Sequence, residues 1–159
     1  MKKPLLFFLQ IALLLTVLTS CSSDNDVDIP SENSESSVEE TILSLVNEHR
    51  RSLSLEILKE NATAKQLAVN HAQFMANQEE LSIDGNAERK AQLQNTESAT
   101  AVIELNSRFY SPEELVQNWL TQGSQTKNTL ESNYSDVGIA AVKDKNGNNY
   151  YTLIMFRAR

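Results

Sequence analysis

The ten residues SPEELVQNWL at positions 111–120 carry the strongest local signal in this sequence. Ser111 is a helix N-cap residue, Pro112 suits the first helical position, and Glu114 completes a capping box with the serine. The next residues place apolar side chains at helical spacing; they are Leu115, Val116, Trp119 and Leu120. The segment therefore predicts a helix that begins at Pro112 and packs one face on a core.

Four other segments are predicted to be helical. Residues 37–51 repeat apolar side chains at helical spacing and carry acidic residues in the first turn. Residues 62–78 follow Asn61, a plausible N-cap, and place small apolar residues on one face. Residues 86–95 and 124–131 are predicted to form a polar helix and a short helix.

The strand signals come late in the chain. Residues 137–142 and 149–156 are rich in β-branched and aromatic side chains, and an Asn-Gly pair at 146–147 lies between them. This pattern is typical of a β-hairpin. Residues 101–105 are a candidate third strand. Helices followed by an antiparallel sheet predict an α+β fold.

Two groups of aromatic residues are given different predicted environments. Four aromatic side chains are predicted to belong to the core: Phe109, Tyr110, Trp119 and Phe156. Three tyrosines are predicted to lie half exposed on the sheet and its approach: Tyr134, Tyr150 and Tyr151.

The composition excludes several classes of protein. The chain has 159 residues, of which 40% are apolar and 22% charged, so it can bury a core and is not a disordered protein. A single cysteine excludes a disulfide scaffold. The net charge of −7 argues against a nucleic-acid partner, because binding phosphates needs a basic surface. The sequence contains neither a phosphate-binding glycine loop nor a Gly-x-Ser-x-Gly nucleophile elbow, and no cofactor is predicted.

The first residues are predicted to be a secretory signal peptide, residues 1–20. Two lysines at the start precede an apolar run over residues 4–18, which is the usual layout. The following Leu-Thr-Ser-Cys resembles the bacterial lipobox. The resemblance implies cleavage before Cys21, a diacylglyceryl thioether on its sulfur and an acylated N-terminus, with palmitate as an expected acyl group. The membrane is then a partner through the lipid on Cys21; the alternatives are an ordinary signal peptide or an uncleaved anchor.

Residues 21–36 contain five acidic residues, five serines and no basic residue, so we predict a solvated tether. The folded domain is then residues 37–159. Asp24, Asp26 and Asp28 resemble the acidic stretch that sends some lipoproteins to the surface of two-membrane bacteria. The expected location is therefore the cell envelope, at the outer membrane, with exposure on the cell surface as the further expectation.

Five segments resemble the bacterial branch of the CAP superfamily, the cysteine-rich secretory, antigen 5 and pathogenesis-related 1 proteins. They are LVNEHR at 45–50, the His-Ala and Met-Ala pairs within 67–76, the helix at 111–120, NYSDVG at 133–138 and the closing strand at 150–156. The resemblance covers residues 40–156. It implies a three-layer αβα sandwich of the CAP type, in which helices flank a small antiparallel sheet.

The resemblance also implies a central cleft with two histidines and one or two glutamates, which binds a divalent metal in some members. Ser82-Ile83 stands where the family has Ser-His, and Gln125 stands where it has the second histidine. Glu104 aligns with the family carboxylate after a one-residue slip, although Ile103 aligns equally well. We therefore expect a vacated site with no catalytic residue and no metal. Ser82, Ile83, Glu104 and Gln125 are its predicted positions.

Three functions from different classes follow. The first is a non-catalytic binding module that presents its cleft to a lipid, a glycan or a protein. The alternative is a hydrolase or metal-dependent enzyme with a rearranged cleft. The third is a structural envelope protein that acts through its tether and oligomerisation. The resemblance implies that the two histidines, His49 and His71, are structural helix-packing residues. They fall on different predicted helices, so nothing in the sequence brings them together as metal ligands.

Overall fold

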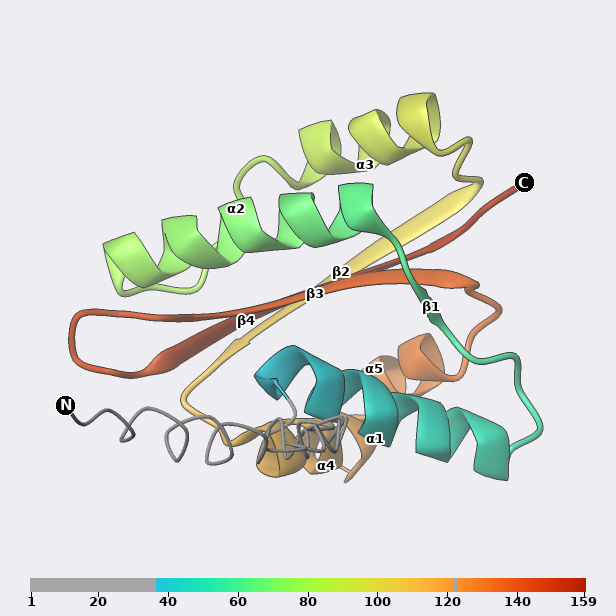
Figure 1. Cartoon of the computed structure of the whole chain (residues 1–159), viewed down its shortest axis with the longest axis horizontal. Helices are drawn as coiled ribbons and strands as arrows, with labels where there is room; N and C mark the ends of the chain where they lie inside the picture. The colour runs from blue at the N-terminus through green and yellow to red at the C-terminus, as the bar shows by residue number, and fades with distance from the viewer. Residues whose placement is uncertain (1–36, 122) are drawn as a thin grey trace, which may run out of the picture. The chain divides into compact units, whose positions relative to one another are not determined.

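The computed structural model describes residues 37–121 and 123–159. The predicted signal peptide 1–20, the lipidated Cys21 and the tether 21–36 lie outside the described residues. Within the described ranges, no helix is long and apolar enough to cross a bilayer. The elements in chain order (Figure 1) are α1 (Val38–Ser52), β1 (Lys59–Glu60), α2 (Ala62–Gln78), α3 (Asn86–Thr96), β2 (Ala101–Arg108), α4 (Pro112–Thr121), α5 (Ser124–Leu130), β3 (Asp136–Lys143) and β4 (Asn149–Arg157).

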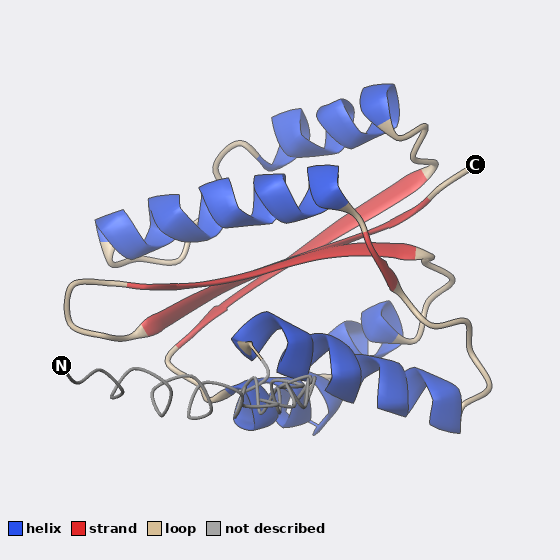
Figure 2. Ribbon diagram, viewed as in Figure 1, coloured by secondary structure: helices blue, strands red, loops and turns tan. Residues whose placement is uncertain are grey.

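The strands form one sheet in the order β1-β3-β4-β2. Helices α2 and α3 cover one face of this sheet, and α1, α4 and α5 cover the other (Figure 2). The predicted α+β three-layer sandwich is therefore confirmed. The sheet is mixed rather than purely antiparallel, because β1 pairs with β3 in parallel. β1 has only two residues, too few to show the alternation that marks a strand in sequence.

The two layers of helices bury separate apolar clusters against the sheet. One cluster joins α1, α4 and α5 to the sheet and includes Trp119 and Leu153. The other joins α2 and α3 to the sheet and includes Leu93 and Ile154. Neighbouring residues of β4 thus face different layers, as the alternation of side chains along a strand requires.

The predicted caps and the predicted hairpin are present. Ser111 and Glu114 exchange the two hydrogen bonds of a capping box at the start of α4, at 2.9 and 3.3 Å. The predicted N-cap Asn61 accepts a hydrogen bond from the Ala64 amide at 2.9 Å. Ser37 and Glu40 form a further capping box at α1, which was not predicted. In the turn between β3 and β4, Gly147 has φ +84°, a conformation that glycine adopts without strain. These caps and this turn could be predicted from the sequence because each depends on residues no more than four positions apart.

The predicted environments of the aromatic residues are partly wrong. Trp119 and Phe156 are buried as expected, but Phe109 is 57% exposed and Tyr110 is also exposed. Phe109 follows the end of β2, and its ring contacts the Tyr150 ring at an interplanar angle of 73°. Both Tyr150 and its neighbour at 151 are buried, against expectation, because β4 is an inner strand with helices over both faces.

Arg50 is the largest polar side chain in the interior, with 1% of its surface exposed. From the last turn of α1 it donates to the carbonyl oxygen of Glu56 at 2.8 Å and of Leu130 at 2.5 Å. It also donates to the carbonyl oxygens of Ser132 and Tyr134, both at 3.0 Å. One guanidinium therefore fixes the path of the chain both after α1 and after α5.

Gly138 marks the closest approach between α2 and the sheet. A Cβ atom at this position would lie 2.1 Å from the carbonyl carbon of Ala64 and 2.2 Å from the nitrogen of Lys65. Both are backbone atoms in the first turn of α2. The absence of a side chain at 138 is thus what lets the helix start directly over β3.

Candidate functional site

A buried polar cluster forms where β2 meets α2 and α3. The carboxylate of Glu104, on β2, has only 2% of its side chain exposed. Arg89 of α3 donates two hydrogen bonds to it, at 2.7 and 2.8 Å. Asn106, two residues along the same strand, donates a third bond at 2.8 Å. This carboxylate is therefore held by a bidentate arginine and an amide, which is the arrangement that a buried charge requires.

His71 of α2 connects this cluster to the chain between α2 and α3. Its Nε2 atom lies 2.9 Å from the carbonyl oxygen of Ser82 and 3.5 Å from the carboxylate of Glu104. Both neighbours accept hydrogen bonds, so we assign a proton to Nε2. The Asn106 amide also donates to the Ser82 carbonyl at 3.0 Å. The buried Oδ1 atom of Asn106 has no partner among the described residues.

The electrostatics keep Glu104 ionised. Burial by itself would raise the pKa of this carboxyl, but the hydrogen bonds from Arg89 and Asn106 and the charge of Arg89 outweigh it and lower the pKa. A carboxylate with a lowered pKa and three donated hydrogen bonds is a poor general base. Glu104 therefore has the features of a structural carboxylate.

We expect Glu104→Gln to lower the free energy of unfolding at neutral pH by about 2 kcal/mol, because it leaves Arg89 partly unpaired in the interior. The folded-state pKa of Glu104 is lowered, so its stabilising effect is present above the ordinary value of about 4.3 and is lost as the pH falls through the lowered value. The variant should therefore lose less stability between neutral and acidic pH than the parent. Urea unfolding at both pH values measures this.

Glu88→Gln is the matched control, since Glu88 is an exposed carboxylate on the same helix as Arg89. It should lower the free energy of unfolding by no more than about 0.5 kcal/mol, the contribution of an exposed carboxylate in the first turn of a helix. The pH dependence of stability should change correspondingly little. An unchanged acid dependence in Glu104→Gln would contradict the assignment of an ionised, buried carboxylate.

Three of the four predicted cleft positions lie together. Ser82, Ile83 and Glu104 line one hollow of about 360 Å³, beside the middle of β2. The Ile83 side chain is 77% exposed at its mouth. Gln125 is exposed on α5, which belongs to the other layer of helices (Figure 1). The structure thus groups Ser82, Ile83 and Glu104 and places Gln125 elsewhere. Of the two residues that align with the family carboxylate, Glu104 faces α2 and α3, whereas Ile103 packs in the cluster on the opposite face of the sheet.

Sequence reasoning missed the partners of Glu104. Asn106 could have been found, because residues two apart on a strand share a face. Arg89 comes from a different element, and no local pattern links it to β2. His71 was interpreted as a helix-packing residue, and its ring is indeed buried against the chain at Ser82.

The second histidine lies on the opposite side of the sheet. Nε2 of His49, on α1, is 2.8 Å from the carboxylate of Glu131, which also lies 3.9 Å from the Lys127 amine. His49 and His71 are thus in different layers. Within residues 37–121 and 123–159, no three side chains of His, Cys, Asp or Glu are grouped to hold a metal ion.

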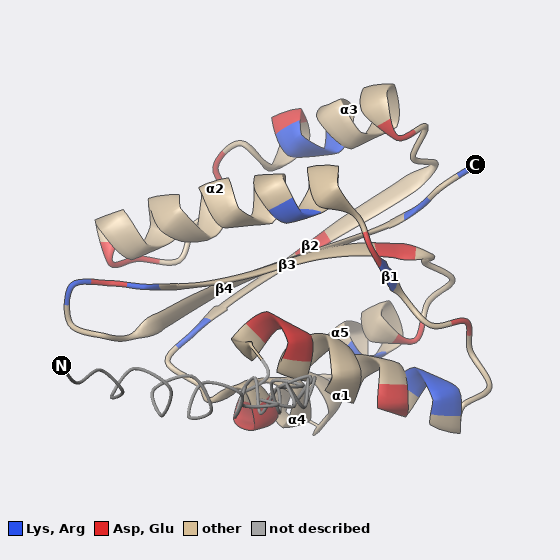
Figure 3. Ribbon diagram, in the orientation of Figure 1, with Lys and Arg blue, Asp and Glu red and all other residues tan. Residues whose placement is uncertain are grey.

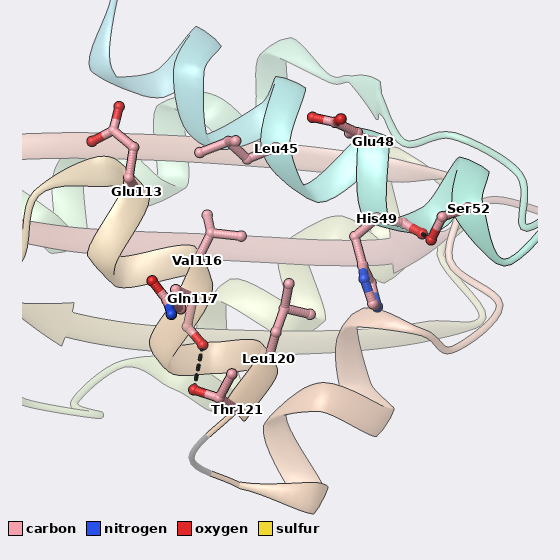
Figure 4. A pocket seen from close by; sticks show the side chains of 9 residues that line it. All are labelled: Leu45, Glu48, His49, Ser52, Glu113, Val116, Gln117, Leu120 and Thr121. Carbon is pink, nitrogen blue, oxygen red and sulfur yellow. Dashed lines mark hydrogen bonds between the residues drawn. The ribbon is translucent and has the colours of Figure 1, made fainter.

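A second hollow, of about 430 Å³, runs between α1 and α4 (Figure 4). Its apolar lining comes from Leu45 on α1 and from Val116 and Leu120 on α4. His49 and Glu113 lie at its rim. Apolar walls with a few polar groups suit an apolar ligand better than a glycan, whose hydroxyl groups need many hydrogen-bond partners.

The sequence and the fold both have known counterparts. Residues 43–156 match the cysteine-rich secretory protein family (CAP). No curated protein sequence matches the chain. Among solved structures, the fold is similar to an outer surface protein from Borrelia burgdorferi, with 16% identity and a TM-score of 0.66 over 74% of this chain and 90% of that one.

Two further structures share the fold with this domain. An extracellular protein from Bacillus anthracis that contains an SCP domain has 18% identity and a TM-score of 0.61, over 75% of this chain and 40% of that one. A cysteine-rich secretory protein from Staphylococcus aureus has 18% identity and a TM-score of 0.62, over 74% of this chain and 37% of that one. At these identities the likeness is one of fold.

Proposed function

Because the chain belongs to the cysteine-rich secretory protein (CAP) family, as the match over residues 43–156 shows, we propose that it is a lipid-anchored lipoprotein of the bacterial cell envelope. Its CAP domain is a non-catalytic binding module with a vacated site. The Borrelia relative is an outer surface protein and the Bacillus relative is extracellular, which supports a location outside the cytoplasmic membrane.

The state of Glu104 is the observation that carries the non-catalytic role. This carboxylate aligns with the family's site glutamate after a one-residue slip, and its oxygens are engaged by Arg89 and Asn106. Ile83, at the first histidine position, offers no lone pair, and Gln125 at the second lies in the other layer. A domain that keeps a hollow but has no free base or ligand set beside it is suited to binding.

A zinc titration tests this role. Titrating zinc into the protein by calorimetry at neutral pH should give no 1:1 binding in the micromolar range, since His71 and Glu104 supply only two ligand groups and both are already bonded. Micromolar or tighter 1:1 binding that His71→Ala abolishes would overturn the vacated site. His49→Ala is the matched control, because that histidine lies in the other layer.

Lipid attachment has its own test. Cys21→Ser is expected to abolish incorporation of labelled palmitate in a bacterial host and to release the protein from the membrane fraction, because the thioether requires the sulfur. Ser22→Ala should leave both unchanged. Labelled palmitate on the Cys21→Ser protein would contradict the lipobox assignment.

A further inference from the structure

The outer edge of β2 is open. Among the strands of residues 37–121 and 123–159, β2 pairs with β4 alone, so one side of this eight-residue strand has no described strand beside it. The amide of Phe109 donates to the carbonyl oxygen of Asn149 at 2.9 Å. Because hydrogen-bonded and non-bonded residues alternate along an antiparallel pair, the odd-numbered residues of β2 are the ones that bond to β4. The N–H and C=O groups of even-numbered residues, including Glu104 and Asn106, therefore point away from it.

These outward groups have no backbone partner within the described ranges of the chain. Proteins usually protect such an edge with proline, lysine or a covering loop. The sequence of β2, AVIELNSR, contains neither proline nor lysine. Its two charged side chains are already engaged, Glu104 by Arg89 and Arg108 by the carbonyl oxygen of Glu79. An edge of eight residues whose outward backbone groups are unpaired is a template for one more strand.

An added strand would contact the side chains that lie beside this edge. The even-numbered side chains of β2 face α2 and α3, as the contacts of Glu104 with Arg89 show. On that face lies the hollow formed with Leu81, Ser82 and Ile83, from the connection between α2 and α3. Leu81 and Ile83 are both exposed there, and the bond from Asn106 to the Ser82 carbonyl holds this connection against the strand.

The charges beside the hollow indicate the kind of strand. Glu80 and Asp84 flank the two apolar residues and are exposed, and their carboxylates form no ion pair among the described residues. The two nearby arginines have other partners: Arg89 is paired with Glu104, and Arg108 donates to the carbonyl oxygen of Glu79. Figure 3 shows acidic positions in this connection between α2 and α3. The whole chain carries a net charge of −7, so a second copy would bring like charges together. A basic partner is complementary.

We propose that the open edge of β2 binds an extended peptide segment of a partner protein by strand addition. Apolar side chains of the segment lie against Leu81 and Ile83, and flanking basic side chains reach Glu80 and Asp84. The backbone bonds of β2 supply affinity, and the hollow supplies specificity. This inference rests on the proposed binding role and names the class of partner.

The test follows individual backbone amides of the ¹⁵N-labelled full chain in detergent micelles by NMR hydrogen exchange. The probe is the peptide acetyl-Lys-Thr-Val-Thr-Val-Thr-Lys-amide, whose lysines and valines share one face. At about 1 mM peptide, exchange at Glu104 and Asn106 should slow by at least about tenfold. Ile103 and Leu105 should not change, because their amides already bond to β4.

Two methylated peptides examine the hydrogen bonds themselves. In antiparallel addition the valine amides point at β2, so N-methylation of both valines should abolish binding while N-methylation of the threonines should not. If N-methylation of the threonines abolishes binding and N-methylation of the valines does not, the peptide is added in parallel, which also supports strand addition. Equal binding of both methylated peptides, or no slowing at Glu104 and Asn106, would overturn it.

Ile83→Lys should weaken peptide binding by about tenfold or more, because it removes the apolar contact and adds a repelling charge. Leu53→Lys, an exposed leucine at the C-cap of α1, should have no effect. Slowing of the same amides with protein concentration and no peptide would identify a second copy as the occupant and overturn the proposed partner. Failure of the proposed binding role would appear as zinc binding in the calorimetric titration. Failure of strand addition would appear as unchanged amide exchange at Glu104 and Asn106, so the two failures are distinguishable.

Discussion

Gly138→Ala is expected to cost at least about 4 kcal/mol of unfolding free energy, more than overpacking usually costs. The new Cβ would lie 2.1 Å from the carbonyl carbon of Ala64, a distance that no rotamer change can relieve because that atom is backbone. Either β3 or the first turn of α2 must move, and both are buried against the core. Against a total stability of about 5–15 kcal/mol, such a loss removes between about a quarter and four fifths of the free energy of unfolding.

Urea unfolding of the parent and the variant measures this effect. Gly123→Ala is the matched control, because the nearest atom to a Cβ at that position, Thr126 Oγ1, is 3.7 Å away. That change should cost less than about 1 kcal/mol, as expected for glycine at a helix N-cap. If the two alanine variants were equally stable, the close approach of α2 to β3 would be wrong.

Arg50→Met should also cost at least about 3 kcal/mol, because burying unsatisfied carbonyl oxygens is expensive. The methionine fills similar volume but removes the arginine donor from four carbonyl oxygens, those of Glu56, Leu130, Ser132 and Tyr134. The bond to Leu130 is buried, and of the four only Ser132 keeps a bond from another backbone amide of the described residues, that of Tyr134. Burial lowers the pKa of Arg50 and the nearby carboxylate of Glu56 raises it, with burial the larger effect.

Arg50→Lys separates geometry from charge. A lysine keeps the positive charge but cannot direct donors at carbonyl oxygens in three directions, so it should recover less than half of the loss. Arg51→Met, at the exposed neighbouring position, should leave the urea midpoint unchanged. Parent-like stability of Arg50→Lys would show that the charge alone matters.

The sequence predicted those parts of the fold that depend on neighbouring residues. The start of α4 at Pro112, the full extent of α2 at 62–78 and the hairpin at Gly147 each follow from a cap, a repeat or a turn. β1 was missed because two residues carry no pattern. β2 was predicted to end at residue 105 but continues to Arg108. The boundary was wrong because the polar residues Asn106 and Ser107 are typical of loops.

The candidate site was predictable only in part. Alignment to the family placed Ser82, Ile83 and Glu104 beside one another, and the hollow at β2 contains all three. It could not place Gln125, because the position of α5 depends on the path of the chain after α4. Arg89 was beyond prediction for a similar reason: its pairing with Glu104 depends on how α3 lies across the sheet.

The position of β4 has a consequence for how the protein is made. β2 and β3 do not pair with each other; each forms its antiparallel ladder with β4, which is later in the sequence than both. During synthesis from the N-terminus, neither layer of helices has a completed sheet to cover until residues 149–157 have left the ribosome. Neither layer of helices can therefore reach its native packing before β4 has been made.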